Sequence, residues 1–173
     1  MAKSTSIGMQ EWMEYFRQAT QEVVSTALKF EAPSKPEKGV RAEPRPKAAA
    51  AAKDDARRPG AYISILSDVA SMHLGITATA EGCRTLARSL LGYHPTQDVT
   101  DQETGDAVSE LMNIIAGKVK SRVSERDHTL RLGLPMFIQG RIQETGSMER
   151  QASEIQVGPV TCQLLVYRNK RSA

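Results

Sequence analysis

Apolar residues recur every three or four positions near the start of the chain, which predicts an amphipathic helix over residues 8–30. This spacing places the apolar side chains on one face of the helix. The sequence therefore predicts a helix that can pack on its own domain or on a partner's. The apolar positions are Trp12, Phe16, Ala19, Val23, Ala27 and Phe30.

Two further helices are predicted in the middle of the chain. Residues 80–91 carry apolar side chains at helical spacing, with Thr79 as a candidate N-cap and Gly92 as a candidate stop. Thr100 begins a capping box, because a glutamate follows three residues later. The pattern after it predicts a helix that runs to about Val123. Its apolar stripe is Ala107, Val108, Leu111, Ile114, Ile115 and Val119.

Short β-prone runs make up much of the remaining sequence, and Gly158-Pro159 supplies a turn between the last two. The order along the chain is one helix, two strands, two helices and then about four strands. This segregated order is typical of an α+β fold with helices packed on one face of a largely antiparallel sheet. The predicted strands are Tyr62–Leu66, Met72–Thr79, Thr129–Leu134, Phe137–Arg141, Ala152–Val157 and Val160–Tyr167.

Residues 31–60 differ from both flanking regions. They hold five of the eight prolines and an alanine run, and they lack large apolar periodicity. Proline prevents a continuous helix, and so few apolar groups cannot offset the entropy lost on ordering. We therefore predict a disordered or semi-extended linker over 31–60, which joins the 8–30 helix to a main body over 61–168.

The charge balance argues against a nucleic-acid partner. The formal net charge of +3 arises within residues 31–60, which hold eight basic and five acidic side chains, whereas the rest of the chain is balanced. A nucleic-acid binder concentrates basic residues on a folded face, often with stacking aromatics, and here aromatics are sparse. Binding through the basic linker is the only form of this hypothesis left open.

From the sequence we expect a cytoplasmic protein that has no membrane partner. No run approaches the roughly 18 apolar residues that a membrane span needs. The N-terminus leads into no apolar signal segment. Cys83 and Cys162 match no metal or redox spacing, so we expect them to be reduced core residues.

The helix that starts near Thr100 carries a polar stripe largely opposite its apolar stripe. Residues three or four apart are neighbours on a helix surface, so Glu110 and Asn113 should project side by side. Gly117 follows one turn later, although glycine inside a helix costs roughly 1 kcal/mol relative to alanine. Such a glycine is best explained where another surface approaches the backbone. The whole stripe is Glu103, Asp106, Glu110, Asn113, Gly117 and Lys120.

A Glu/Asn pair contains no nucleophile with an adjacent base to activate it. An asparagine amide both donates and accepts hydrogen bonds, so it can orient a water molecule without accepting its proton. That suffices for phosphoryl hydrolysis, where catalysis is mostly positioning and charge stabilisation. The ordinary alternative is that Glu110 and Asn113 are merely solvated, and the E-x-x-N spacing alone does not decide between the two.

Two segments resemble those of a known family. Asp106-Ala-Val-Ser-Glu-Leu-Met-Asn-Ile-Ile-Ala-Gly117 resembles the signature helix of the CheC/CheX/FliY chemotaxis phosphatases. Leu130-Arg-Leu-Gly-Leu-Pro-Met-Phe-Ile-Gln-Gly140 resembles the Leu-Pro strand that comes next in that family. The helix over 80–91 and the first helix fit as well, so the resemblance covers about 8–30 and 61–167.

The resemblance implies a phosphatase that hydrolyses the aspartyl-phosphate of a CheY-type receiver domain. Asn113 would position the attacking water, and Glu110 would pair with the receiver's lysine. Asp106, Gly117 and Lys120 would contact the partner. The Mg²⁺ would belong to the receiver, so the resemblance implies no cofactor or metal site in this chain.

The resemblance also implies one site per chain. CheC-type members carry a second E-x-x-N in the first helix, whereas here Glu11 is followed three residues on by Glu14, and Glu22 by Ser25. A single site is similar to the CheX type and implies a homodimer. Lys118 stands where the family often has asparagine.

A function of a different class remains open. A module of the same fold could bind a receiver without catalysis, as a scaffold or as a sensor of its phosphorylation. Intact Glu110 and Asn113 favour the enzyme, because a scaffold needs no water-positioning amide. The three histidines lack ligand spacing, and neither G-x-S-x-G nor a phosphate-binding glycine loop is present.

Overall fold

The computed structural model describes residues 7–30, 58–68, 71–140, 142 and 145–169. Most of the predicted linker therefore lies outside the described residues, although Gly60 already belongs to the first strand. The elements are α1 (Met9–Ala27), β1 (Gly60–Leu66), β2 (Ser71–Thr77), α3 (Ala80–Leu91), α4 (Asp101–Val123), β3 (Arg131–Leu132), β4 (Met136–Ile138), β5 (Met148–Val157) and β6 (Val160–Asn169).

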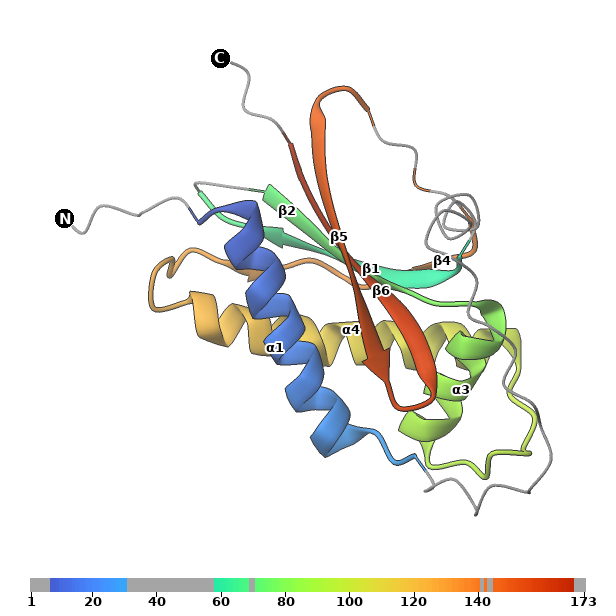
Figure 1. Ribbon diagram of the computed structural model, residues 1–173. Helices are drawn as coiled ribbons and strands as arrows, with labels where there is room; N and C mark the ends of the chain where they lie inside the picture. Colours follow the sequence, from blue (N-terminus) through green and yellow to red (C-terminus); the bar gives the residue numbers. More distant parts are fainter. Residues whose placement is uncertain (1–6, 31–57, 69–70, 141, 143–144, 170–173) are drawn as a thin grey trace, which may run out of the picture.

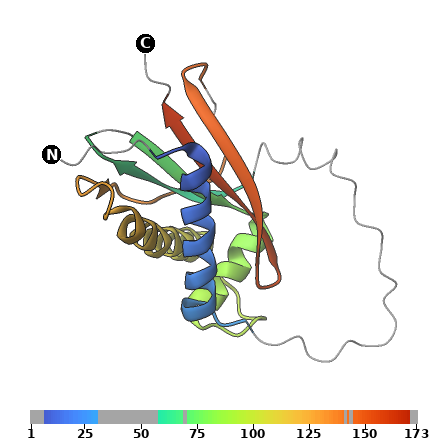
Figure 2. The same cartoon turned by 60° about the vertical axis from the view of Figure 1, so that its left-hand side comes forward.

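The strands form one antiparallel sheet in the order β3-β1-β2-β6-β5, with β4 also paired to β1. The three described helices cover one face of this sheet (Figure 1 and Figure 2). Their apolar faces meet the inward side chains of β1, β2 and β6 in a single core. The predicted α+β architecture is therefore confirmed. No described helix is long and apolar enough to cross a membrane.

The first helix ends earlier than its apolar pattern predicts. α1 stops at Ala27, and Leu28 takes an extended conformation rather than continuing to residue 30. The extended chain carries Phe30 to the two-residue turn between β5 and β6, where a Cβ at Gly158 would lie 2.4 Å from the Phe30 ring. Gly158 also has a positive φ of 55°, so glycine is required there for both reasons. The predicted Gly158-Pro159 turn is thus confirmed.

The strands after α4 are shorter than the predicted runs over 129–134 and 137–141. Ile65 of β1 pairs with Leu132, whereas Tyr62 pairs with Met136. Between these two pairs, two residues of β1 therefore face three residues of the opposite chain. An extra residue of this kind interrupts pairing, as in a β-bulge, and splits one edge strand into β3 and β4.

Strand β5, in contrast, begins at Met148, four residues before the prediction. Its first half is polar and pairs with β6, at the end of the hairpin that extends beyond the helices (Figure 1 and Figure 2). A second, smaller apolar cluster occupies the other face of the sheet and was not predicted. It contains Tyr62, Leu165 and Tyr167, with Ile138, Ile142 and Met148 packed against it.

Candidate functional site on helix α4

Helix α4 is fixed at its first turn by the predicted capping box. The Thr100 side chain accepts a hydrogen bond from the Glu103 backbone N–H at 3.1 Å, and the Glu103 carboxylate accepts from the Thr100 N–H at 2.9 Å. Tyr93 also donates to Glu103, at 3.2 Å. These bonds, chiefly the one from the Thr100 backbone, lower the pKa of Glu103. Glu103 therefore holds the helix start, in addition to lying half-buried on the predicted polar stripe.

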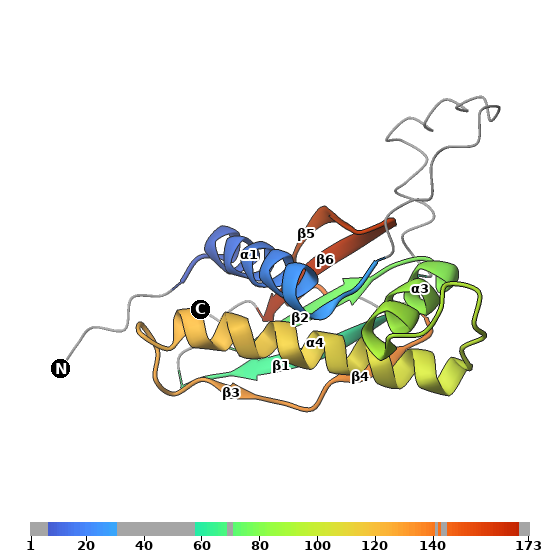
Figure 3. The ribbon, with the colours of Figure 1, turned by 90° about the horizontal axis from the view of Figure 1, so that it is seen from below.

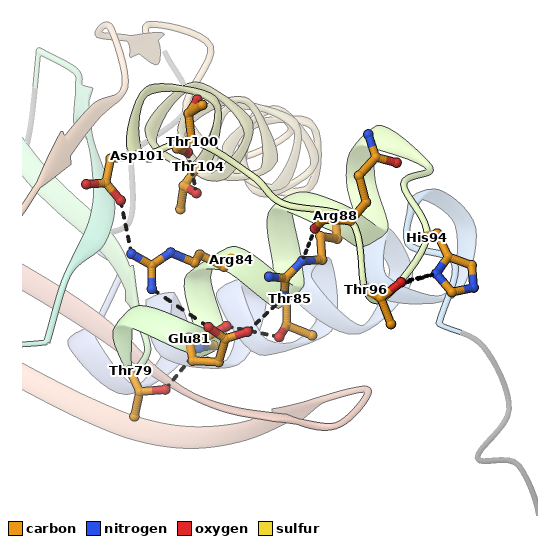
Figure 4. A network of polar contacts seen from close by, with 12 residues as sticks. Thr79, Glu81, Arg84, Thr85, Arg88, His94, Thr96, Thr100, Asp101 and Thr104 are labelled. Carbon is orange, nitrogen blue, oxygen red and sulfur yellow. Dashed lines mark hydrogen bonds and ion pairs between the residues drawn. The ribbon is translucent and has the colours of Figure 1, made fainter.

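Ion pairs also hold the start of α4 against α3. Arg84 lies between Glu81 and Asp101, the first residue of α4, and its guanidinium is 3.1 Å from the Asp101 carboxylate (Figure 4). Arg88 pairs with Glu81 at 2.8 Å. The caps predicted for α3 are both present, because Thr79 accepts from the Gly82 N–H and Gly92 is left-handed.

The inward face of α4 is buried along the length of the helix. Leu111, Met112, Ile115 and Val119 are each no more than 1% exposed, so the backbone of α4 cannot shift without disturbing the core. The apolar stripe predicted from the sequence is confirmed, with Ile114 partly buried at its margin.

The two candidate catalytic side chains lie together on the outward face. Glu110 is exposed and Asn113 is half-buried. The Asn113 Nδ2 donates to Glu110 Oε2 over 3.4 Å, near the outer limit for a hydrogen bond. Within the described part of the chain this is the only hydrogen bond of the Asn113 side chain. The amide oxygen and a second N–H are therefore available for an external group.

The other residues of the predicted stripe lie along the same face. Asp106 is exposed and Lys120 is half-buried. A Cβ added to Gly117 would have no atom within 4 Å, so nothing in the described chain explains this glycine. Gly105, in contrast, faces a close neighbour within the fold, because its Cβ would lie 3.3 Å from the Phe137 ring.

A family model describing the chemotaxis phosphatase CheX matches residues 60–156, which is more than half of the chain and includes all of α4. The chain belongs to the CheX family. Comparison with curated protein sequences finds no match. The signature helix and the Leu-Pro strand, which carried the resemblance, both lie within the matched residues.

Solved CheX structures share the fold. The CheX protein of Desulfovibrio desulfuricans has a TM-score of 0.66 at 20% identity, over 92% of this chain and 99% of that chain. CheX of Vibrio vulnificus has a TM-score of 0.64 at 15% identity, over 93% and 98%. The CheX-CheY-BeF3-Mg complex of Borrelia burgdorferi has a TM-score of 0.64 at 18% identity, over 92% and 98%.

One charged feature beside the CheX signature helix was missed from the sequence. Glu22 of α1 contacts Lys118 at 2.6 Å and Arg122 at 2.7 Å, both on α4. Glu11 of α1 pairs with Arg126, which follows the end of α4. The hydrogen bond from Lys118 is the main cause that lowers the pKa of Glu22. The ion pairs hold α1 along one flank of the outward face.

The sequence contained a signal for these ion pairs, which form the seam between α1 and α4. Glu11 and Glu22 are eleven residues apart, close to three helical turns, and Lys118, Arg122 and Arg126 follow at intervals of four. Opposite charges at helical spacing were therefore recognisable on the two helices, but nothing in the sequence showed that the helices would lie side by side.

No group of three His, Cys, Asp or Glu side chains among the described residues is arranged to hold a metal ion.

Proposed function

We propose that this CheX-family chain hydrolyses the aspartyl-phosphate of a CheY-type receiver domain, with Asn113 and Glu110 as its catalytic residues. The observation that carries the proposal is the pair itself: two adjacent side chains on the outward face of a helix whose back is fixed in the core. The Borrelia burgdorferi CheX was solved with CheY, which supports a receiver as the partner.

The chemistry follows from the geometry of the amide. Asn113 accepts a hydrogen bond from the attacking water through its oxygen and orients it towards the phosphorus atom. The weak contact with Glu110 gives way, and the Glu110 carboxylate pairs with a lysine of the receiver. Hydrolysis of an acyl phosphate proceeds through a loose transition state, so positioning of water contributes more than proton transfer.

A divalent cation at the reacting phosphoryl group is assigned to the receiver in this proposal. Mg²⁺ is commonly bound by one or two carboxylates together with phosphate oxygens. This chain contributes the amide that positions the water and the carboxylate that pairs with the receiver and aligns the two proteins.

The docking surface in this proposal extends along α4 from Asp106 to Lys120. Gly117 lets the receiver approach the helix backbone closely. Acidic Asp106 lies towards one end of this face and basic Lys120 towards the other, so a partner with the reverse polarity is favoured in one orientation. The homodimer and the cytoplasmic location, both implied by the resemblance or the sequence, stay predictions.

The proposal is tested with a Mg²⁺-loaded, phosphorylated CheY-type receiver and purified protein. Asn113→Ala should lower kcat by at least about 100-fold, an effect of the size found when one transition-state hydrogen bond is lost, while the receiver still binds. Glu110→Ala should weaken both binding and turnover. Asn169→Ala, at an exposed asparagine at the end of β6, is the matched control and should behave like wild type.

The non-enzymatic alternative makes the opposite forecast. If cognate receivers bind wild type but none loses its phosphoryl group faster, the phosphatase proposal fails and a scaffold or sensor takes its place.

A further inference from the structure

One apolar side chain is unusually exposed near the candidate site. Leu134 is 85% exposed, more than any other large apolar side chain in the described part of the chain. It lies in the connection between β3 and β4, where the extra residue interrupts pairing with β1. Single exposed apolar residues are common on protein surfaces, so its location decides whether it has a role.

The β3–β4 connection runs antiparallel to α4 along one flank of that helix (Figure 3). Gly105 and Phe137 mark a point where the two segments touch. Leu134 precedes Phe137 by three residues, roughly 10 Å of extended chain. The same 10 Å along a helix is roughly six to seven residues beyond Gly105. Leu134 therefore lies level with the turn that carries Glu110 and Asn113.

We propose that Leu134 is an apolar anchor for the phosphorylated receiver domain, which rests on the function proposed above. Asn113 reaches the phosphoryl group only if the receiver covers the outward face of α4. A typical interface buries about 800 Å² of each partner, equivalent to a circular patch with a radius of about 16 Å. A receiver centred on Glu110 and Asn113 therefore covers Leu134 as well.

The surroundings of the site indicate what kind of surface the anchor fits. On the opposite flank of α4 lies the ion-paired seam with α1, which contains Lys118 and Glu22. The flank of the β3–β4 connection thus presents exposed apolar side chains, Leu134 and Met136, and the flank that carries Lys118 presents ion pairs. The matching receiver surface has an apolar side chain on one side of its phosphorylated aspartate and polar groups on the other. Contacts of both kinds around one centre fix the orientation of docking.

The test compares Leu134→Ala with a matched control. Leu66 is 46% exposed at the end of β1, and its neighbours in the alternation, Tyr62 and Ser64, lie on the sheet face away from the core. The probe is a CheY-type receiver loaded with beryllofluoride and Mg²⁺, whose Kd is measured by titration calorimetry. Phosphate release from the phosphorylated receiver gives kcat and KM.

Leu134→Ala should raise Kd and KM about tenfold, since burial of a leucine side chain contributes on this scale. Its kcat should be unchanged, because an anchor that does not contact the phosphoryl group binds ground and transition states equally. Leu134→Met should restore affinity, and Leu66→Ala should match wild type. All variants should keep the wild-type Tm, because both leucines are exposed.

The two proposals fail separately. If wild type releases phosphate and Leu134→Ala has wild-type Kd and KM, the anchor is refuted and the phosphatase stands. If wild type binds the receiver without releasing phosphate, the phosphatase fails, and a tenfold weaker Kd for Leu134→Ala still supports the anchor. If no cognate receiver binds, both proposals are overturned.

Discussion

Substitution of Gly117 by alanine should separate stability from activity. Gly117 lies in the third quarter of α4, and a Cβ there meets no atom within 4 Å. Alanine is favoured over glycine in a helix interior by about 0.8–1 kcal/mol. With no packing gained or lost, Gly117→Ala should stabilise the isolated protein by nearly that amount. For a domain of this size the gain corresponds to a Tm increase of about 2–4 °C.

The same methyl group should impair the reaction. In the proposed complex the receiver approaches the α4 backbone at Gly117, and overpacking of a close contact costs about 1–3 kcal/mol. The expected result is therefore a fall of about tenfold in kcat/KM, in a protein that is more stable than wild type.

Gly105→Ala is the matched control for this substitution. It offers the same gain in helix propensity, but its Cβ would lie 3.3 Å from the Phe137 ring, so the ring must move by a few tenths of an ångström. Its Tm should rise less than that of Gly117→Ala, and its kcat/KM should change little. Both quantities come from calorimetry and from phosphate release on the same preparations.

Two results would contradict the role of Gly117 in docking. A lower Tm for Gly117→Ala would mean that its surroundings are not open. A higher Tm with unchanged kcat/KM would mean that the receiver does not approach the α4 backbone at Gly117. Gly117 would then lie outside the docking surface and would only lower the stability of the helix.

Three further predictions concern the frame of the site. Leu111→Ala removes a side chain that is 1% exposed and should lower the free energy of unfolding in urea by about 3 kcal/mol; a loss below about 1 kcal/mol would contradict its place in the core. Glu22→Gln should destabilise the protein above pH 4.5, the ordinary pKa of its carboxyl, because the folded-state pKa is lowered, chiefly by the hydrogen bond from Lys118. The difference from wild type should vanish as the pH falls through that lowered value, and a difference that persisted in acid would disprove the ion pair. Burial raises the pKa of Cys83 to about 11 and that of Cys162 to about 12, so neither thiol should react with a thiol reagent at pH 8 until the protein unfolds; rapid labelling of the native protein would contradict their burial.

Elements with strong local signals were predicted well from the sequence. The capping box at Thr100, the N-cap at Thr79 and the left-handed Gly92 are local chemistry, so α3 and α4 begin and end where the pattern placed them. The alternation along β6 likewise follows from burial of one side of each strand. The same logic gave the outward position of Glu110 and Asn113.

Features that depend on tertiary contacts could not be predicted in this way. Helix α1 ends at Ala27 because the extended chain after it places Phe30 against Gly158, and these two residues are 128 positions apart in the sequence. The division between β3 and β4 arises from a register difference against β1, which no local pattern records. The hydrogen bond from Tyr93 to Glu103 likewise joins the loop before α4 to the predicted cap, and no local pattern indicates it.

The most direct test of the account is turnover of a phosphorylated CheY-type receiver, present with Mg²⁺ in large molar excess over this protein. Wild type should release many equivalents of phosphate per chain above the receiver's own rate. Asn113→Ala should release almost none beyond that rate, while its Kd for the beryllofluoride-loaded receiver stays close to that of wild type. Equal turnover by wild type and Asn113→Ala would show that the Asn113 amide does not position the attacking water.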